Sequence, residues 1–274
     1  MAFKSIVIPV LAVKEDEPAL HAGEVVADMA DAGLTAVYME IEPDPIVAAD
    51  GYISGEVWDQ ISRQIADDAR AAKSALEGRA WSRRISMREL RTRPSMAGED
   101  FAVIARCADL TIMSRPAGDL TGPMRSTLFD AALFSSGRPV MLIPPVWRDG
   151  IGRRVFIAWN GKRESARAVA DAAPFLETAD RVVIATLASE EQQNKASADA
   201  IVANLARHGV KVDLKFVPTH GGDEGVQLMD AALAFDADLF VMGGYGHARA
   251  AEFIFGGVTR TLSNTAPVPV LMSH

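Results

Sequence analysis

The chain has 274 residues, 49% of them hydrophobic, with a formal net charge of −8. These values exclude a disordered or fibrous chain, and the length corresponds to about two domains. The acidic balance gives no overall attraction to nucleic acid or to an anionic membrane, so neither is expected as a partner. The single cysteine, Cys107, excludes an internal disulfide framework and fits a reducing compartment, so we expect a cytoplasmic protein.

The first predicted element is a strand in the short apolar run 5–9. Pro9 interrupts that run and acidic residues follow it, which argues against a signal peptide. An Ala-rich helical stretch comes next, and Met29 within it is expected to be a core residue. The segment 43–60 contains two prolines and two glycines and predicts a loop or a short extra helix.

Six arginines and Trp81 lie between Arg79 and Arg93. Such a stretch would suit RNA or another anion, because arginines pair with phosphates and aromatic rings stack on bases. In an acidic chain, we favour a strand and turn with a solvated basic face.

The chain contains an internal repeat. The segment Ala108–Met113 is similar to Ala237–Met242, and a Pro-Val-apolar run follows each of them, at 138–143 and at 268–272. This self-similarity predicts a tandem duplication.

The linker 144–152 separates the two copies and is rich in proline and glycine, which resist both helix and strand. We therefore predict two domains, at residues 1–146 and 153–274.

Short apolar runs alternate with helical patterns throughout the second half. This alternation predicts a doubly wound α/β domain, whose parallel sheet is covered by helices on both faces. The predicted strands are 155–159, 181–187, 210–217, 239–243 and 268–272, and the predicted helices are near 164–177, 191–208, 223–236 and 257–265.

Ligands of parallel sheets bind outside the carboxyl ends of the strands, so the informative residues should follow Trp159, Leu187 and Met242. After Met242, the chain is rich in glycine. Glycine lets backbone N–H groups approach phosphate oxygens, and a helix start favours an anion. His247 or Arg249 could add a donor, and Thr259 a hydroxyl. The alternative is that the glycines only form two tight turns.

Other well-known motifs do not fit. A Walker loop and a dinucleotide fingerprint are both absent, and the chain has no nucleophile elbow. No metal-ligand spacing is present, so neither a metal site nor a catalytic residue is predicted. The histidines are His21, His208, His220, His247 and His274.

The glycine pattern resembles the nucleotide-binding signature of the universal stress protein (UspA) family. It consists of Gly243, two residues, Gly246, nine residues and the run 256–259, and it closes with the Pro-Val run 267–270. The repeated layout resembles tandem members of that family, which implies two Rossmann-like domains of the adenine nucleotide alpha hydrolase type. The binding residues implied in this way, together with His247 inside the motif, are Asn160, Gly243, Gly246, His247, Gly256, Gly257, Val258 and Thr259.

The resemblance implies an adenine nucleotide as ligand: ATP, with AMP or ADP as alternatives. A Mg²⁺ ion accompanying ATP would be held mainly by phosphate oxygens and water. Two positions depart from the family's pattern. Gly257 stands where Ser or Thr is usual and lacks a hydroxyl contact, and Asn160 stands where nucleotide binders carry Asp and lacks the charge.

The first half departs further from the pattern. By alignment of the two copies, Ser114 replaces Gly243, Ala117 replaces Gly246, and Ser126 and Thr127 replace the glycines at the helix start. Pro116 removes an N–H donor from the loop. We therefore expect a degenerate first domain with a structural or partner-binding role.

These features together predict an ATP-binding stress-response or signalling protein that uses its C-terminal domain as a nucleotide sensor and acts on a protein partner not yet identified. Two alternatives remain: a protein-interaction module that binds no nucleotide, and a slow ATPase in which His247 could act as a general acid. The resemblance also implies that the final strands of the two halves pair as an intramolecular pseudo-dimer. Further assembly into a homodimer stays open.

Overall fold

The computed structural model describes residues 2–42, 47–48, 51–52, 55–78, 85–115, 122–148, 150–244 and 257–274. Its strands are β1 (Ser5–Val10), β2 (Gly33–Ile41), β3 (Val47–Ala48), β4 (Gly51–Tyr52), β5 (Ile85–Thr92), β6 (Leu110–Ser114), β7 (Val140–Ile143), β8 (Arg154–Ala158), β9 (Arg181–Leu187), β10 (Val212–Val217), β11 (Leu239–Gly243) and β12 (Val270–Ser273). Its helices are α1 (Val13–Ala30), α2 (Gly55–Glu77), α3 (Ala97–Ala105), α4 (Gly122–Ser135), α5 (Arg163–Asp171), α6 (Ala173–Leu176), α7 (Glu191–Arg207), α8 (Glu224–Ala234) and α9 (Gly257–Thr265), with a 3-10 turn η1 (Ala188–Glu190).

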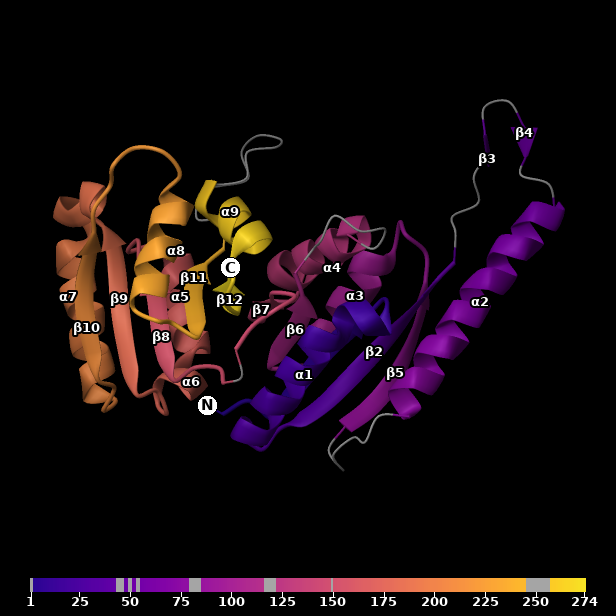
Figure 1. Cartoon of the computed structure of the whole chain (residues 1–274), viewed down its shortest axis with the longest axis horizontal. Coiled ribbons are helices and arrows are strands. Elements are labelled where there is room, and N and C mark those ends of the chain that lie inside the picture. Colours follow the sequence, from indigo (N-terminus) through magenta and orange to yellow (C-terminus); the bar gives the residue numbers. More distant parts are fainter. Residues whose placement is uncertain are drawn as a thin grey trace.

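Ten of the described strands form one sheet, in the order β10-β9-β8-β11-β12-β7-β6-β1-β2-β5 (Figure 1). Read outward from the centre, the second half runs β12-β11-β8-β9-β10 and the first half runs β7-β6-β1-β2-β5. The two orders match strand for strand. Within this sheet, all pairs inside each half are parallel, and β3 and β4 form a separate antiparallel pair. The predicted α/β fold with a parallel sheet is therefore confirmed.

The duplication also extends to single hydrogen bonds. Asp109, just before β6, accepts hydrogen bonds from the backbone N–H groups of Lys4 and Ser5. Asp238, just before β11, does the same for Gly152 and Arg154. In both halves, a carboxylate thus fastens the start of the first strand to the start of the fourth.

Helices cover both faces of the sheet (Figure 1). Helices α1, α5, α6 and α7 contribute to one buried apolar cluster, and α3, α4, α8 and α9 contribute to the other. Successive strand residues alternate between the clusters, because side chains along a strand point to opposite faces. For example, Ile6 and Ile8 belong to the first cluster and Val7 to the second. None of the described helices is both long and apolar enough to span a membrane.

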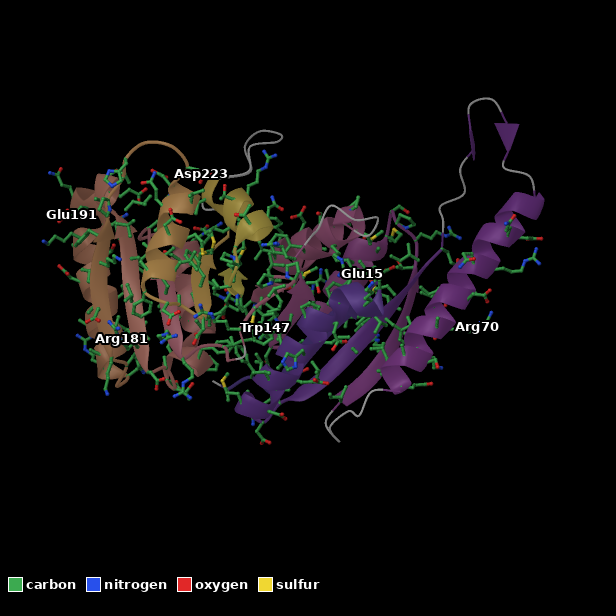
Figure 2. All side chains as sticks on the ribbon, viewed as in Figure 1. Glu15, Arg70, Trp147, Arg181, Glu191 and Asp223 are labelled. Carbon is green, nitrogen blue, oxygen red and sulfur yellow. The ribbon has the colours of Figure 1, made fainter. Side chains whose placement is uncertain are left out.

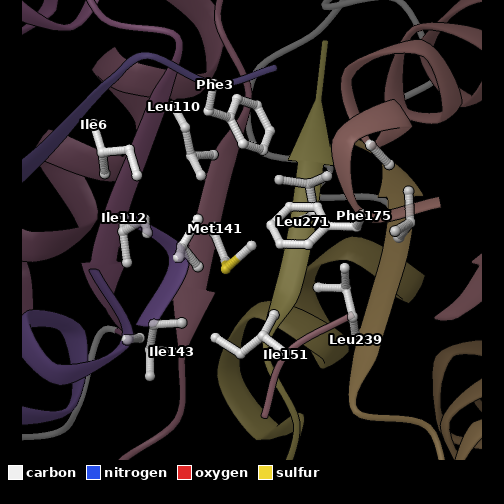
Figure 3. Close-up of a cluster of buried hydrophobic side chains, with 14 of the residues drawn as sticks. Phe3, Ile6, Leu110, Ile112, Met141, Ile143, Ile151, Phe175, Leu239 and Leu271 are labelled. Atoms are coloured by element: carbon white, nitrogen blue, oxygen red, sulfur yellow. The ribbon is translucent and has the colours of Figure 1, made fainter. Parts of the chain in front are cut away.

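The two halves meet at β7 and β12, which pair antiparallel. Val270 lies opposite Leu142, and Leu271 lies opposite Met141. Figure 3 shows Met141 and Leu271 within a continuous group of apolar side chains that spans this seam. The strand pairing expected between the halves is confirmed, and it covers two edges that would otherwise be exposed.

In the second half, the strands 181–187 and 239–243 and the helix 257–265 are as predicted. The helix predicted near 164–177 is divided into α5 and α6, because Pro174 has no N–H to donate and interrupts the helical ladder.

Two predictions for the first half are wrong. The insertion 43–60 was expected to be a loop or short helix, but α2 begins at Gly55 and continues for 23 residues. Met29 was expected in the core, but it is 42% exposed. Met29 lies in the last turn of α1, on the side of the helix that faces solvent.

The described end of the arginine-rich stretch forms strand β5, at the outer edge of the sheet. Arg91 on this strand donates to both carboxylate oxygens of Glu40, at 3.0 Å each. Nearby, the Tyr38 hydroxyl donates to Glu89. Burial of Tyr38, together with this hydrogen bond, raises the pKa of Tyr38 to about 12. Arg91 therefore pairs with acidic neighbours, whereas residues 79–84 lie outside the described part of the chain.

Candidate functional site

A cleft lies at the carboxyl ends of β8, β9 and β11, where ligands of parallel sheets bind. It contains about 420 Å³ of space between protein atoms, part of it open to solvent. Figure 2 shows that Arg181, at the start of β9, lies at the opposite edge of this half from Asp223, at the start of α8. The described lining residues are Ala158, Trp159, Asn160, Ala185, Leu187, Glu190, Leu228, Met242, Gly243 and Val258.

Gly243 lines the cleft at the end of β11, and it is also required for packing. A Cβ atom on Gly243 would lie 2.6 Å from the backbone carbon of Glu164 and from the backbone nitrogen of Ser165. The start of helix α5 thus passes directly over this residue, and any side chain would push the helix away. Packing against α5 therefore requires glycine at position 243, independently of any ligand.

Gly257 has a different environment. It is the first described residue of α9, and apart from its chain neighbours and the backbone of its own helix, no described atom lies within 4 Å of the position that its Cβ would occupy. The next residue, Val258, lines the cleft, whereas Thr259 is only 5% exposed and does not. The first turn of α9 thus brings backbone N–H groups to the cleft, where they favour an anion.

Helix α9 is held in place by the cap of its neighbour α8. Asp223 accepts hydrogen bonds from the backbone N–H groups of Gly225 and Val226, and its other carboxylate oxygen accepts one from the Thr261 hydroxyl. The hydrogen bond from Thr261 is the main reason that the pKa of Asp223 is lowered. Gly225 makes this close approach possible, since a Cβ there would lie 3.1 Å from the Cα of Val258.

Asn160 lies on the opposite wall of the cleft, just after β8. Its side-chain oxygen accepts a hydrogen bond from the backbone N–H of Lys162 at 3.1 Å, which closes a tight turn before α5. Gly161, between them, has a φ of +71°, a conformation that favours glycine. The amide of Asn160 thus has a structural partner and keeps acceptor and donor capacity for a ligand.

Glu190 is a cleft residue that the sequence did not single out. It ends the 3-10 turn η1 after β9, and of the described lining residues it alone carries an ionisable side chain. The sequence rule that informative residues follow Leu187 pointed to this position. An acidic residue three positions after a buried strand was the signal that could have found it.

Comparison with known proteins connects this geometry to a family. Residues 156–274 match the model of the universal stress protein family. The second half of the chain is therefore similar to the universal stress protein family. No curated protein matches the chain in sequence.

Two solved structures share the fold over the whole chain. A universal stress protein from Archaeoglobus fulgidus DSM 4304 is 13% identical, with a TM-score of 0.68 over 98% of this chain and 97% of that one. A protein of unknown function from Pseudomonas aeruginosa PAO1, PA1789, is 15% identical, with a TM-score of 0.59 over 99% and 92% of the two chains. At these identities, the likeness concerns the fold alone.

Three predicted residues of the universal stress protein motif, Gly246, His247 and Gly256, lie outside the described residues. Among the described residues, no group of three or more His, Cys, Asp or Glu side chains is arranged to hold a metal ion. The residues brought together at the cleft are therefore Asn160, Gly243 and Val258, with Gly257 beside them.

The corresponding edge of the first half contains a buried ion pair. Arg125 of α4 contacts Asp16 of α1, and the two side chains are 2% and 0% exposed. Asp16 also accepts hydrogen bonds from the backbone N–H groups of Leu11 and Ala12, just after β1. By strand register, Leu11 corresponds to Asn160. Asp16 and Arg125 thus fill the edge that forms a cleft in the universal stress protein half.

One expectation for the first half needs correction. Ser126 and Thr127 were expected at a helix start, but α4 already begins at Gly122. Their hydroxyls donate to the carbonyl oxygens of Gly122 and Pro123 within the helix, at 3.0 and 3.1 Å. Ser114 ends β6 as expected, and Ala117 and Pro116 lie outside the described residues.

The first half also supports the motif from across the seam. Arg115 donates to the carbonyl oxygen of Ala266, at the end of α9, over 2.7 Å. Burial lowers the pKa of Arg115. The Phe134 ring meets the His274 ring edge-on, and Nδ1 of His274 lies 3.0 Å from the carbonyl oxygen of Gly244. Both the far end of α9 and the end of β11 thus rest on the first half.

Proposed function

We propose that residues 153–274 form a nucleotide-sensing domain that binds an adenine nucleotide, ATP above all, and that residues 1–146 form a supporting domain. The observation that carries this proposal is the cleft at the carboxyl edge of the universal stress protein half, joined to a helix start at Gly257 where space is left open. The match of residues 156–274 to the universal stress protein family model supports it.

The described residues suit the parts of a nucleotide. Leu187, Leu228 and Met242 give the cleft an apolar wall for a base. The first N–H groups of α9 have no partner within the helix and would donate to phosphate oxygens. Phosphate oxygens and water would supply most ligands of an accompanying Mg²⁺.

We expect binding without fast turnover. Backbone donors bind ATP and its hydrolysis products with similar geometry, so they stabilise the ground state about as well as the transition state. A turnover number of about 1 to 10 per second, typical of enzymes, that disappears in His247→Ala would instead establish an ATPase.

The direct experiment is calorimetric titration of the purified chain with ATP, together with identification of any nucleotide released on denaturation. One equivalent of ATP per chain is expected, because the first half has its corresponding edge filled by Asp16 and Arg125. A stoichiometry of two would place a site in the first half, and absence of binding at millimolar ATP would refute the proposal.

A second candidate is a protein-interaction module that binds no nucleotide. Two observations favour it: helix α5 crosses closely over Gly243, and the side chain of Asn160 closes a turn. Both residues would be needed without any ligand. The same titration separates the two functions, since an interaction module takes up no ATP.

A further inference from the structure

We infer that Glu190 is a specificity-determining residue that accepts hydrogen bonds from the ribose hydroxyls of the bound nucleotide. The cleft would then select ribonucleotides over 2′-deoxyribonucleotides. This inference rests on the proposed nucleotide binding and adds to it a preference at the sugar.

The Glu190 side chain is held in place by a hydrogen bond from a residue of α7. Its Oε2 accepts a hydrogen bond from Nδ2 of Asn194 at 2.9 Å, and Asn194 is only 8% exposed. The Ser197 hydroxyl donates to the Asn194 carbonyl oxygen and accepts from the indole N–H of Trp159. This chain of hydrogen bonds joins Glu190 to the end of β8, the strand next to β9.

One carboxylate oxygen of Glu190, a residue that lines the cleft, makes no hydrogen bond with the described residues. Glu190 occupies the cap position of α7, yet its side chain makes no capping hydrogen bond there. Within the described part of the chain, Asn194 supplies its one side-chain hydrogen bond, and that bond uses Oε2. A carboxylate accepts through both oxygens, so Oε1 has capacity for donors of a ligand.

Charge determines which part of a nucleotide lies beside Glu190. A carboxylate repels phosphate, whereas the N–H groups at the start of α9 attract it. Glu190 follows β9, and α9 follows β11, with β8 between those two strands. The carboxyl ends of β9 and β11 are two strand spacings apart, which is about 10 Å. The phosphates are therefore directed toward α9, and the nucleoside toward Glu190.

Within the nucleoside, the 2′ and 3′ hydroxyls are paired donors that suit a fixed carboxylate. Doubly wound folds that bind dinucleotides use an acidic residue in this way, with its side chain on the ribose 2′-hydroxyl. Glu190 has the corresponding place after the second strand of its half. A hydrogen bond to a charged group contributes enough to change affinity by about tenfold or more.

The test is calorimetric titration of the full chain with ATP and with 2′-deoxy-ATP. We expect the wild-type protein to bind ATP about tenfold more tightly than 2′-deoxy-ATP. In Glu190→Ala, ATP should bind more weakly than it does to the wild-type protein, and ATP and 2′-deoxy-ATP should bind with equal affinity. Glu191→Gln is the matched control: the adjacent residue loses the same charge but does not line the cleft, so the preference should persist.

Three results would overturn the inference. Equal binding of the two nucleotides by the wild-type chain would remove the sugar preference while leaving the proposed function intact. Tighter binding of both nucleotides by Glu190→Ala would place the phosphates, not the ribose, beside Glu190. Binding of neither nucleotide by the wild-type chain would refute the proposed function and the inference with it.

Discussion

Replacing Gly257 by serine should strengthen nucleotide binding. Gly257 begins α9 at the edge of the cleft, and apart from its chain neighbours and its own helix backbone, no described atom lies within 4 Å of the position of an added Cβ. The substitution therefore meets no steric obstacle among the described residues. It adds a hydroxyl at the position where the universal stress protein signature usually has Ser or Thr.

The gain can be estimated from the charge of the acceptor. A hydrogen bond to a charged group contributes about 1.5 to 3 kcal/mol, whereas ordering a small side chain costs a fraction of that. We therefore expect Gly257→Ser to lower the Kd for ATP by about tenfold. Stability should stay the same or rise slightly, since glycine is a poor helix former.

Gly257→Ala is the control at the same position. It adds the same Cβ without the hydroxyl, so its Kd for ATP should stay near the wild-type value. Calorimetry with ATP gives the affinities, and urea unfolding gives the free energies of unfolding of the three proteins. Equal Kd values for Gly257→Ser and Gly257→Ala, in a protein that binds ATP, would refute the reasoning.

Four further substitutions test packing and hydrogen bonds in both halves of the chain. Gly243→Ala should lower the free energy of unfolding in urea by about 1 to 3 kcal/mol, because its Cβ would meet the backbone of α5 at 2.6 Å. Asp223→Ala should lower the free energy of unfolding by about 1 kcal/mol at pH 7. Because the pKa of Asp223 is lowered in the fold, this difference from wild type should vanish as the pH falls through that pKa. Arg115→Ala should weaken ATP binding, whereas Arg106→Ala, which removes a similar bond at the end of α4, should not. Tyr38 contributes stability that is complete below pH 10 and is lost as the pH rises toward 12, so urea unfolding of Tyr38→Phe should show a smaller loss over that range.

The sequence predicts those elements best whose signal is local. The strands 181–187 and 239–243 are apolar runs between polar turns, and both were located to the residue. Helix α2 was missed because the prolines and glycines before it suggested a loop, although the helical pattern continues well past residue 60. Pairing of β7 with β12 joins residues 130 positions apart, and it was expected from the family resemblance and not from the strands themselves.

The site was predicted less completely, because sequence spacing does not separate packing from binding. Gly243 and Gly257 belong to one glycine pattern, yet α5 crosses the first closely and open space surrounds the second. Glu190 shares no motif with the glycines and reaches the cleft only through the order of the strands. Such residues need the tertiary arrangement to be found.

The buried pair of Asp16 and Arg125 explains why two halves with one topology would bind nucleotide differently. Asp16 accepts the N–H groups that follow β1, so these donors are not available to a ligand. Leaving one member of a buried ion pair without its partner costs about 3 to 5 kcal/mol, so a nucleotide that separated Asp16 from Arg125 would bind at that cost. In the second half, Asn160 corresponds by register to Leu11, and the cleft lies at this edge. Through Arg115, the first half supports the end of α9, the helix whose first turn lines that cleft.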